Sequence, residues 1–214
     1  MNTIKKLLIK FDACKDAIEW AGDKPIEEIV KTCHRGDWLL WLARRIDIPL
    51  KAFILAKGHS AKTVLHLMDD ERSKKAVEVA ILFGEGKATR EELDTAHDAA
   101  YLAYDAAYAA YYAAASASAS AASYAAHAAA YYAAVYAAYA ASAASAYYAS
   151  DSSDTYASAT YAAHASAYYA SSAAAATAAA DASAARTKNE METADIGRKY
   201  IGQLIVNKVN DLCQ

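Results

Sequence analysis

The sequence predicts an all-α fold: a small N-terminal helical domain, then a bundle of long Ala/Tyr-rich helices, and finally a C-terminal amphipathic helix. The strongest observation is that residues 98–185 contain no Lys, Arg, Gly or Pro and consist almost wholly of Ala, Tyr and Ser. Ala has the highest helix propensity, whereas Gly costs about 1 kcal/mol and Pro about 3 kcal/mol in a helix interior. Helix-capping signals precede this segment, and an amphipathic pattern follows it. We therefore expect three units, residues 1–88, 89–186 and 187–214.

Two prolines and a Gly-Asp pair mark the first helices of the N-terminal unit. Pro25 is followed closely by acidic residues and predicts a helix start, since proline at the first helical position gives up an amide that has no partner there. Gly36 and Asp37 open the next helix, and we expect the Asp37 side chain to cap its free amides. Pro49 is predicted to close that helix.

Glycines mark the ends of the next two helices. A third helix is expected through residues 53–57, with its end near Gly58, because glycine is the commonest residue just beyond a helix C-terminus. A fourth helix is expected through residues 76–83, stopped by Gly84 and Gly86. These helices complete the predicted N-terminal domain.

The last two helix starts are read from a capping motif and from apolar spacing. Thr89 and Glu92 form a capping box, in which each residue's side chain accepts a hydrogen bond from the other's backbone amide. The Ala-rich helix is expected to begin there. Residues 189–212 form an amphipathic helix that needs a partner surface. Its apolar residues are Met191, Ile196, Tyr200, Ile201, Leu204, Ile205, Val209 and Leu212.

A repeat carries tyrosines through the Ala-rich segment. Tyr124–Ala133 recurs as Tyr161–Ala170, and Tyr104–Ala113 is a looser copy. Because seven residues make about two helical turns, the paired tyrosines of each copy stack on one helix face. These residues are Tyr104, Tyr111, Tyr124, Tyr131, Tyr161 and Tyr168. The tyrosine stripe is either a core whose hydroxyls reach the surface or a recognition face, since tyrosine is favoured at interfaces.

Charge and composition exclude two kinds of partner for the Ala-rich segment. Residues 98–185 hold five of the 25 acidic side chains and no basic one, so the rest of the chain, with 22 bases, has a balance of +2. Binding nucleic-acid phosphates needs Lys or Arg. The Ser and Tyr residues spread through the segment argue against a membrane span. The three cysteines form no CxxC pair and follow no signal-like segment, so we expect reduced thiols and a cytoplasmic location.

The sequence contains no pattern that is typical of catalysis or of metal binding. Cys33 lies beside His34, but adjacent residues on a helix point apart, so a buried structural cysteine is expected. His127 and His164 occupy equivalent places in the repeat, where hydrogen bonding to tyrosine is the expected role rather than metal binding. There is no Gly-rich phosphate loop, zinc motif or carboxylate pair. We therefore predict no enzyme, no cofactor and no metal site.

A tryptophan-containing motif and a set of basic residues are the remaining candidates for a structural or binding role. Trp38 and Trp41 lie at helical spacing behind Asp37, and Trp20 lies in the preceding helix, so these four residues are predicted to form a structural motif that packs in the core. Candidate anion-binding bases are Arg44, Arg45 and Arg186.

Several stretches together resemble a known family. They are Cys14–Trp20, Cys33–Leu42, Gly86–Glu92, the Ala/Tyr segment and Ala194–Ile201. In this order they resemble bacterial and phage proteins that are described as immunity proteins. The resemblance covers nearly the whole chain. It implies an all-helical, non-enzymatic protein that is associated with toxin systems, and it brings no catalytic residues with it.

Three functions remain open from the sequence. The first is an inhibitory binding protein, an immunity or phage anti-defence factor, that neutralises a toxin or defence effector through its tyrosine face. The second is a sponge that holds a small nucleotide-like signal in a tyrosine-lined pocket, with Arg44, Arg45 or Arg186 on its phosphates. The third is a structural or ice-binding Ala-rich protein. A homo-oligomer is compatible with each of them.

Overall fold

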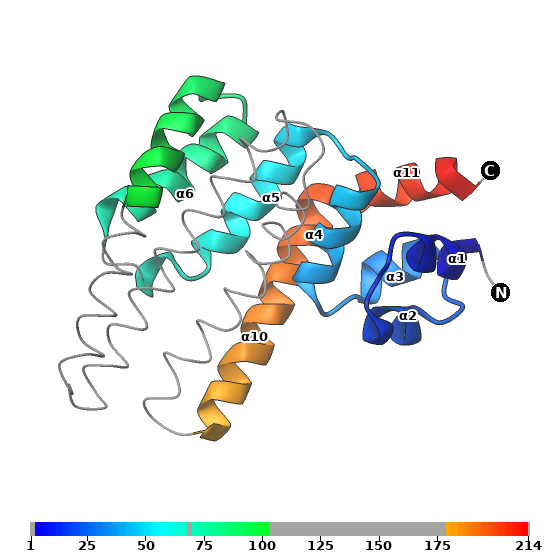
Figure 1. Cartoon of the computed structure of the whole chain (residues 1–214). Helices are drawn as coiled ribbons and strands as arrows, with labels where there is room; N and C mark the ends of the chain where they lie inside the picture. The colour runs from blue at the N-terminus through cyan, green and yellow to red at the C-terminus, as the bar shows by residue number, and fades with distance from the viewer. Residues whose placement is uncertain (1–2, 68–69, 103–178, 214) are drawn as a thin grey trace.

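The computed structural model describes residues 3–67, 70–102 and 179–213 (Figure 1). Every regular element in these ranges is a helix, and no strand occurs in them. The predicted all-α fold class is therefore confirmed. The tyrosine repeats and the bundle expected from them lie outside the described residues, as do His127 and His164.

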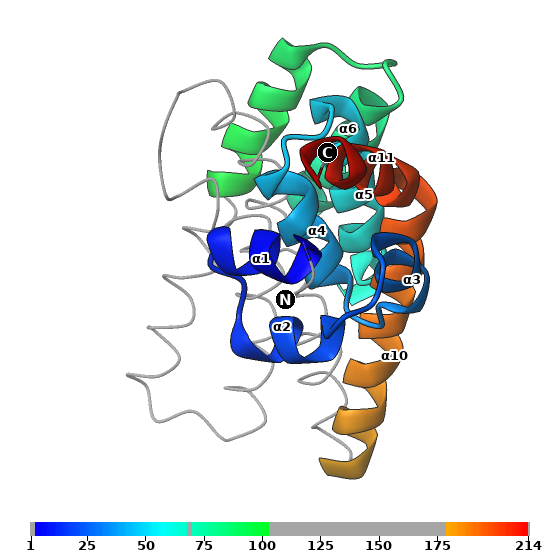
Figure 2. The ribbon, with the colours of Figure 1, turned by 90° about the vertical axis from the view of Figure 1, so that its right-hand side faces the viewer.

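Four helices joined by short loops begin the chain. They are α1 (Thr3–Lys10), α2 (Lys15–Ala21), α3 (Ile26–Thr32) and α4 (Gly36–Arg45). The first three gather at the end of the molecule where both ends of the chain lie (Figures 1 and 2). Pro25 is the N-cap residue of α3, which confirms the predicted helix start.

Two predictions about α4 are wrong. Its N-cap residue is Arg35, whereas Asp37 lies within the first turn and accepts two hydrogen bonds from the Arg35 guanidinium. Pro49 does not close α4, which ends at Arg45, but is the N-cap residue of α5 (Leu50–Lys62). The chain turns between them at Asp47, which has a left-handed φ of 58°. A proline suits the start of a helix because its fixed φ is already helical and its missing amide is not needed there.

The helix α5 continues through Gly58, where the sequence predicted its end. It runs to Lys62 and packs along α6 (Glu71–Gly84). A Cβ at Gly58 would lie 2.8 Å from Ile81 Cγ1 and 3.2 Å from the Ile81 backbone nitrogen. Gly58 therefore allows α5 and α6 to approach closely, which is a second use of glycine besides ending helices.

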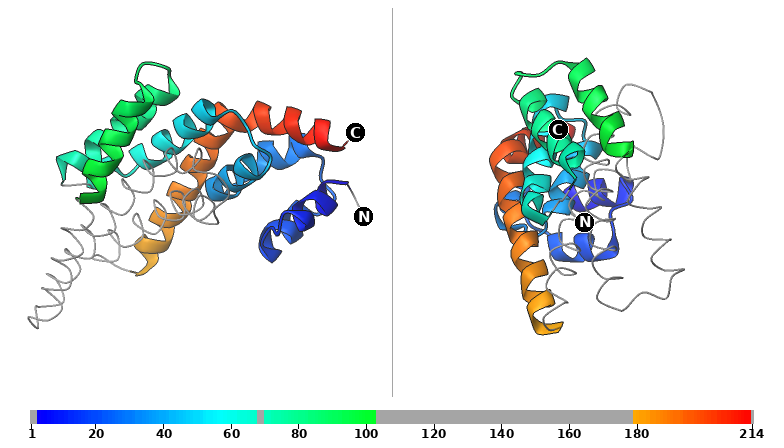
Figure 3. Two further views of the ribbon diagram at one scale, coloured as in Figure 1. Left: turned by 45° about the horizontal axis from the view of Figure 1, so that its top comes forward. Right: turned by 90° about the vertical axis from the view of Figure 1, so that its left-hand side faces the viewer.

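A first core joins α5, α6 and the helix over residues 90–102, which lies beside α6 (Figure 3). Ile54, Val77, Ala80 and Leu93 are among its fully buried members. The predicted capping box at the start of the helix over residues 90–102 is confirmed. The Thr89 amide donates to Glu92 Oε2 over 2.7 Å, and the Glu92 amide donates to Thr89 Oγ1 over 3.2 Å.

The C-terminal residues form one bent run of helix (Figure 3). It consists of α10 (Ala179–Gly197), the π-helix η2 (Arg198–Gly202) and α11 (Gln203–Cys213). Ile201, Ile205 and Val209 are buried, whereas Met191 and Leu212 are each 49% exposed. The predicted amphipathic face thus packs through its middle, and its two ends remain at the surface.

A second core lies between this C-terminal run and the N-terminal helices. It combines apolar residues of α1 to α5 with Ile201, Ile205 and Val209. The C-terminal run therefore completes the core that α1 to α5 begin. The predicted unit boundaries at residues 88 and 186 stay predictions; α10 passes through the second of them without a break. None of the helices in the described ranges is long and apolar enough to cross a lipid bilayer.

Candidate functional site

All three tryptophans of the chain line one pocket. The pocket has a volume of about 280 Å³ and lies among α1, the turn after it, α2, α3 and α4. Its lining residues are Leu8, Asp12, Ala13, Cys14, Ala17, Trp20, Ala21, Ile29, Cys33, Asp37, Trp38, Leu39, Trp41 and Leu42. Most of these side chains are apolar, and the only charged ones are the two aspartates. An apolar pocket with a few polar groups is the usual form of a ligand or anchor site.

Local helix geometry brings the rings together. Trp38 and Trp41 lie three residues apart on α4 and so share one face of it. Trp20 comes from α2, and its ring centroid lies 5.7 Å from that of Trp38. The His34 ring lies 5.8 Å from both. These separations are those of favourable edge-to-face and tilted aromatic contacts. The three tryptophans are partly exposed, so they pack on the core and also border the pocket.

Each tryptophan ring also has a basic side chain of the same chain over it. Lys24 Nζ lies 4.1 Å from the Trp20 ring centroid, and Arg35 Cζ lies 5.1 Å from that of Trp38. Arg45 Cζ lies 5.8 Å from the Trp41 ring. None of these three bases is among the lining residues. They therefore hold the rings in place by cation–π attraction without supplying charge to the pocket wall.

The turn after α1 brings Asp12 to the pocket. Asp12 has a φ of 58°, in the left-handed region that Asp and Asn enter more readily than most residues. Its backbone amide donates to the Ile9 carbonyl over 3.0 Å, and the Ala13 amide donates to the Leu8 carbonyl over 3.0 Å. The turn is thus held by α1 itself. The Asp12 side chain is exposed where it lines the pocket.

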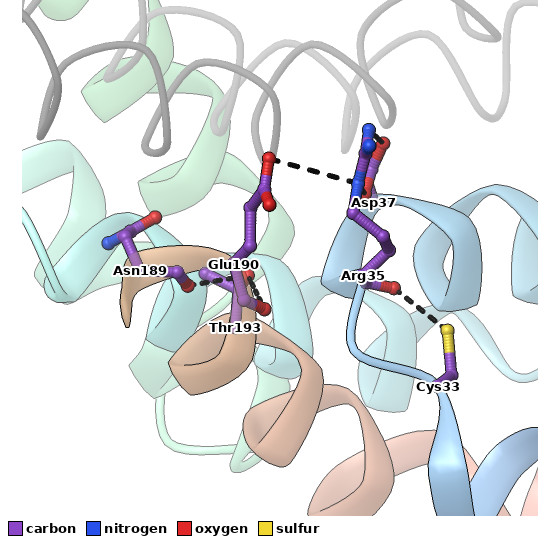
Figure 4. Close-up of polar contacts among 6 residues, drawn as sticks. All are labelled: Cys33, Arg35, Asp37, Asn189, Glu190 and Thr193. Carbon is purple, nitrogen blue, oxygen red and sulfur yellow. Dashed lines mark hydrogen bonds and ion pairs between the residues drawn. The ribbon is translucent and has the colours of Figure 1, made fainter. Parts of the chain in front are cut away.

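The second lining aspartate is built into the fold. Asp37 is 3% exposed and pairs with Arg35, whose Nε also lies 3.9 Å from Glu190 Oε1 of α10 (Figure 4). Gly36 allows the start of α4 to lie close against α10, since a Cβ at Gly36 would lie 2.5 Å from the Thr193 backbone. The hydrogen bond with Asp37 raises the pKa of Arg35. The pocket wall at Asp37 is therefore anchored to the C-terminal run.

The two cysteines of the pocket differ in exposure. Cys14 is exposed, whereas Cys33 is buried and its Sγ donates to the Arg35 carbonyl oxygen over 3.3 Å. Burial raises the pKa of the Cys33 thiol to about 11. A thiol with this pKa is almost wholly protonated near neutral pH and is a poor nucleophile. The prediction of a buried Cys33 is confirmed.

The structure places the other predicted binding residues as follows. The six stripe tyrosines, Tyr104, Tyr111, Tyr124, Tyr131, Tyr161 and Tyr168, lie outside the described residues. Arg44 and Arg45 end α4 and are half-buried. Arg186 belongs to α10, but its side chain is outside the described part. Asp12 and Cys14 line the pocket but were not predicted as site residues from the sequence. Cys14 lies in the first stretch of the family resemblance, but Asp12 carries no comparable sequence signal.

Within the described ranges, no group of three or more His, Cys, Asp or Glu residues has the arrangement of a metal site. Comparison of the chain with protein families, curated proteins and solved structures found no match. The resemblance to immunity proteins therefore stays a prediction.

Proposed function

We propose that this chain is a non-catalytic inhibitory binding protein, an immunity or phage anti-defence factor, that neutralises a toxin or defence effector. The observation that carries the proposal is the pocket lined by Trp20, Trp38 and Trp41. Tryptophan is among the residues that contribute most to binding energy at protein interfaces, and such residues cluster in well-packed pockets. The pocket is the natural place for the anchor side chain of a partner.

The size of the pocket suits one large side chain. An engineered apolar cavity of about 150 Å³ holds one benzene molecule. The present pocket, at about 280 Å³, has room for a longer side chain but is smaller than most drug-sized sites. A single anchor residue on a larger protein fits this volume better than a dinucleotide does.

The chemistry of the lining favours binding over catalysis. Cys33, which is the buried nucleophile candidate, is held protonated by its raised pKa of about 11. His34 makes ring contacts with Trp20 and Trp38. Asp37 is engaged by Arg35. Each of these three polar groups therefore has a structural role, and the proposal assigns none of them to a reaction.

The charge of the wall argues against a nucleotide-like ligand in this pocket. Both charged lining residues, Asp12 and Asp37, are carboxylates, which repel phosphate groups. The sponge hypothesis depended on bases converging on a tyrosine cleft, and its tyrosines lie outside the described residues. The binding protein is therefore the conclusion that we retain.

Capture of the partner with pocket variants tests the proposal. Ala17 lines the pocket on α2, so Ala17→Leu fills it while keeping a strong helix former. Glu19→Leu adds the same side chain at an exposed site of the same helix and serves as the matched control. The full chain and both variants are immobilised and exposed to lysates with candidate effectors co-expressed. Retained proteins are then purified, and their activity is measured as each form of the chain is added.

We expect one effector that the wild type and Glu19→Leu both retain and inhibit. Ala17→Leu should neither retain nor inhibit it. Far-UV circular dichroism of all three forms checks that the fold is kept. An effector that is bound and inhibited equally by Ala17→Leu would show that the pocket is not the docking site. No effector inhibited by the wild type would contradict the function itself.

A further inference from the structure

We infer that the tryptophan-lined pocket takes an arginine side chain of the partner. This inference rests on the proposed function and names the chemistry of its anchor. The reasons are the sign of the charges in the pocket wall, the tryptophan rings that line it, and an internal arginine site of the same composition.

The pocket combines aromatic rings with carboxylates and no base. Asp12 and Asp37 are its only charged lining residues. Tryptophan is the best aromatic partner for a cation, and a carboxylate adds a charge-assisted hydrogen bond. A neutral apolar anchor would use the rings and leave Asp12 beside it without a partner of opposite charge, whereas a cationic anchor would use both.

Arginine satisfies the wall better than lysine does. Its flat guanidinium can stack on an indole ring while its N–H groups donate to a carboxylate in the plane, and it is more weakly hydrated than an ammonium group. Its aliphatic stem suits the apolar part of the wall, which includes Leu8, Ala17 and Leu42.

The chain already contains one such arginine site next to the pocket. The Arg35 guanidinium pairs with Asp37 through two hydrogen bonds and lies 5.1 Å from the Trp38 ring centroid. An anchor arginine between Asp12 and the indole rings would repeat this arrangement of carboxylate, guanidinium and tryptophan. Asp37 is engaged by Arg35, so Asp12, which is exposed, is the carboxylate that receives the anchor.

Charge along the chain is consistent with a basic partner. Residues 98–185 carry five acidic side chains and no basic one. Opposite charge on a partner speeds encounter and favours the correct complex. A basic protein surface that presents an arginine would therefore match both the pocket and the Ala-rich segment in the sign of its charge.

Intrinsic fluorescence tests the inference directly, because every tryptophan of the chain lines the pocket. The 214-residue chain is titrated with N-acetyl-arginine amide and with N-acetyl-citrulline amide, which has the same shape and no charge. N-acetyl-leucine amide serves as a neutral apolar probe. The same titrations are made with Asp12→Asn and with Asp16→Asn. Asparagine tolerates the left-handed backbone at position 12, and Asp16 is an exposed residue outside the pocket wall.

We expect the arginine probe to bind about tenfold more tightly than the citrulline probe, and Asp12→Asn to remove this preference while Asp16→Asn keeps it. Equal affinity for the arginine and citrulline probes would overturn the inference, as would tighter binding of the leucine probe or no binding of any probe. A partner that is captured through the pocket while the arginine probe shows no preference leaves the proposed function standing and removes only its anchor. An arginine preference without any inhibited effector leaves the arginine site standing and removes the proposed function.

Discussion

Arg35 and Asp37 form a two-point pair at the start of α4: Nε donates to Oδ1 over 2.8 Å, and Nη2 donates to Oδ2 over 2.6 Å. The pair borders the tryptophan pocket on one side and reaches Glu190 of α10 on the other. Two residues before Arg35, the Cys33 carbonyl oxygen accepts a hydrogen bond from Arg198 of η2. The segment between α3 and α4 is thereby held to the C-terminal run by an ion pair and a charge-assisted hydrogen bond, and the pocket wall depends on residues from both ends of the chain.

Asp37→Asn should lower the free energy of unfolding by about 2 to 3 kcal/mol. The Asp37 side chain is 4% exposed, so the change leaves the Arg35 guanidinium without its main counter-charge in a largely buried place. Urea unfolding followed by far-UV circular dichroism measures the loss. Glu19→Gln breaks an exposed pair with Lys15 and should cost less than about 0.5 kcal/mol. Equal losses in the two variants would show that the buried Arg35–Asp37 pair stabilises the protein no more than an exposed pair does.

Cys33 should resist alkylation at mildly alkaline pH, while Cys14 is modified. Cys14 is exposed, whereas burial raises the pKa of Cys33 to about 11. Mass spectrometry of the iodoacetamide-treated protein, native and in denaturant, locates the modified residues. Cys33 should react only after unfolding. Its modification at the same rate as Cys14 in the native protein would contradict the buried, protonated state.

The same thiol makes stability depend on pH. A thiol whose pKa is about 9.0 in the unfolded chain and about 11 in the folded protein contributes stability that is complete below pH 9 and is lost as the pH rises to 11. Over this pH window, the free energy of unfolding of the wild type should therefore fall by about 2 to 3 kcal/mol relative to that of Cys33→Ala. The difference between the two unfolding curves removes the contribution of other titrating groups. Parallel curves would rule the effect out.

Lys57 should make stability depend on pH in the opposite direction, so that stability rises with pH. It is fully buried in α5, and burial, aided by repulsion from Arg44, lowers its pKa from 10.5 to about 7. The unfolded chain then holds more protons than the folded protein between pH 7 and pH 10.5, so stability rises with pH in that range. Between pH 7 and pH 9 the free energy of unfolding of the wild type should rise by about 2 kcal/mol relative to that of Lys57→Met. Methionine keeps the length of the side chain and removes the charge, so a constant difference between the two proteins would contradict a lowered pKa for Lys57.

Gly58→Ala should destabilise the protein by about 1 to 3 kcal/mol, although alanine favours a helix by about 1 kcal/mol over glycine. The added Cβ would meet Ile81 Cγ1 at 2.8 Å. Thermal unfolding measures the change. The double variant Gly58→Ala, Ile81→Ala should lose less stability than the sum of the two single variants, because the second change removes the atom that clashes. Stabilisation by Gly58→Ala alone would mean that α5 and α6 do not approach closely at this glycine.

Local signals in the sequence predicted local structure well. The capping box of Thr89 and Glu92 and the helix start at Pro25 depend on residues within one turn of each other, and both are present as expected. Apolar spacing likewise found the buried positions Ile201, Ile205 and Val209. It did not find the π-helix over Arg198–Gly202, which is a single turn of i→i+5 hydrogen bonding inside an otherwise α-helical run.

The wrong predictions for Gly58 and Asp37 share one cause. Gly58 was expected to end a helix, and Asp37 to cap one, from what these residues most often do beside a helix end. Their actual roles depend on Ile81, which is 23 positions away, and on the position and side chain of Arg35. The pocket was missed for a similar reason. The spacing of Trp38 and Trp41 on one helix was visible, but Asp12 and Trp20 join them only through the packing of α1 and α2 on α4.

The sequence alone determined that the protein is helical, because alanine content, capping motifs and apolar spacing act over one or two turns of chain. It also determined the excess of acids in residues 98–185, since charge follows directly from composition. Only the tertiary structure decided that all three tryptophans border one space, that its charged wall residues are carboxylates, and that Glu190 lies beside Arg35. These are relations between residues far apart in the chain, and they arise from helix packing that short-range propensities do not encode.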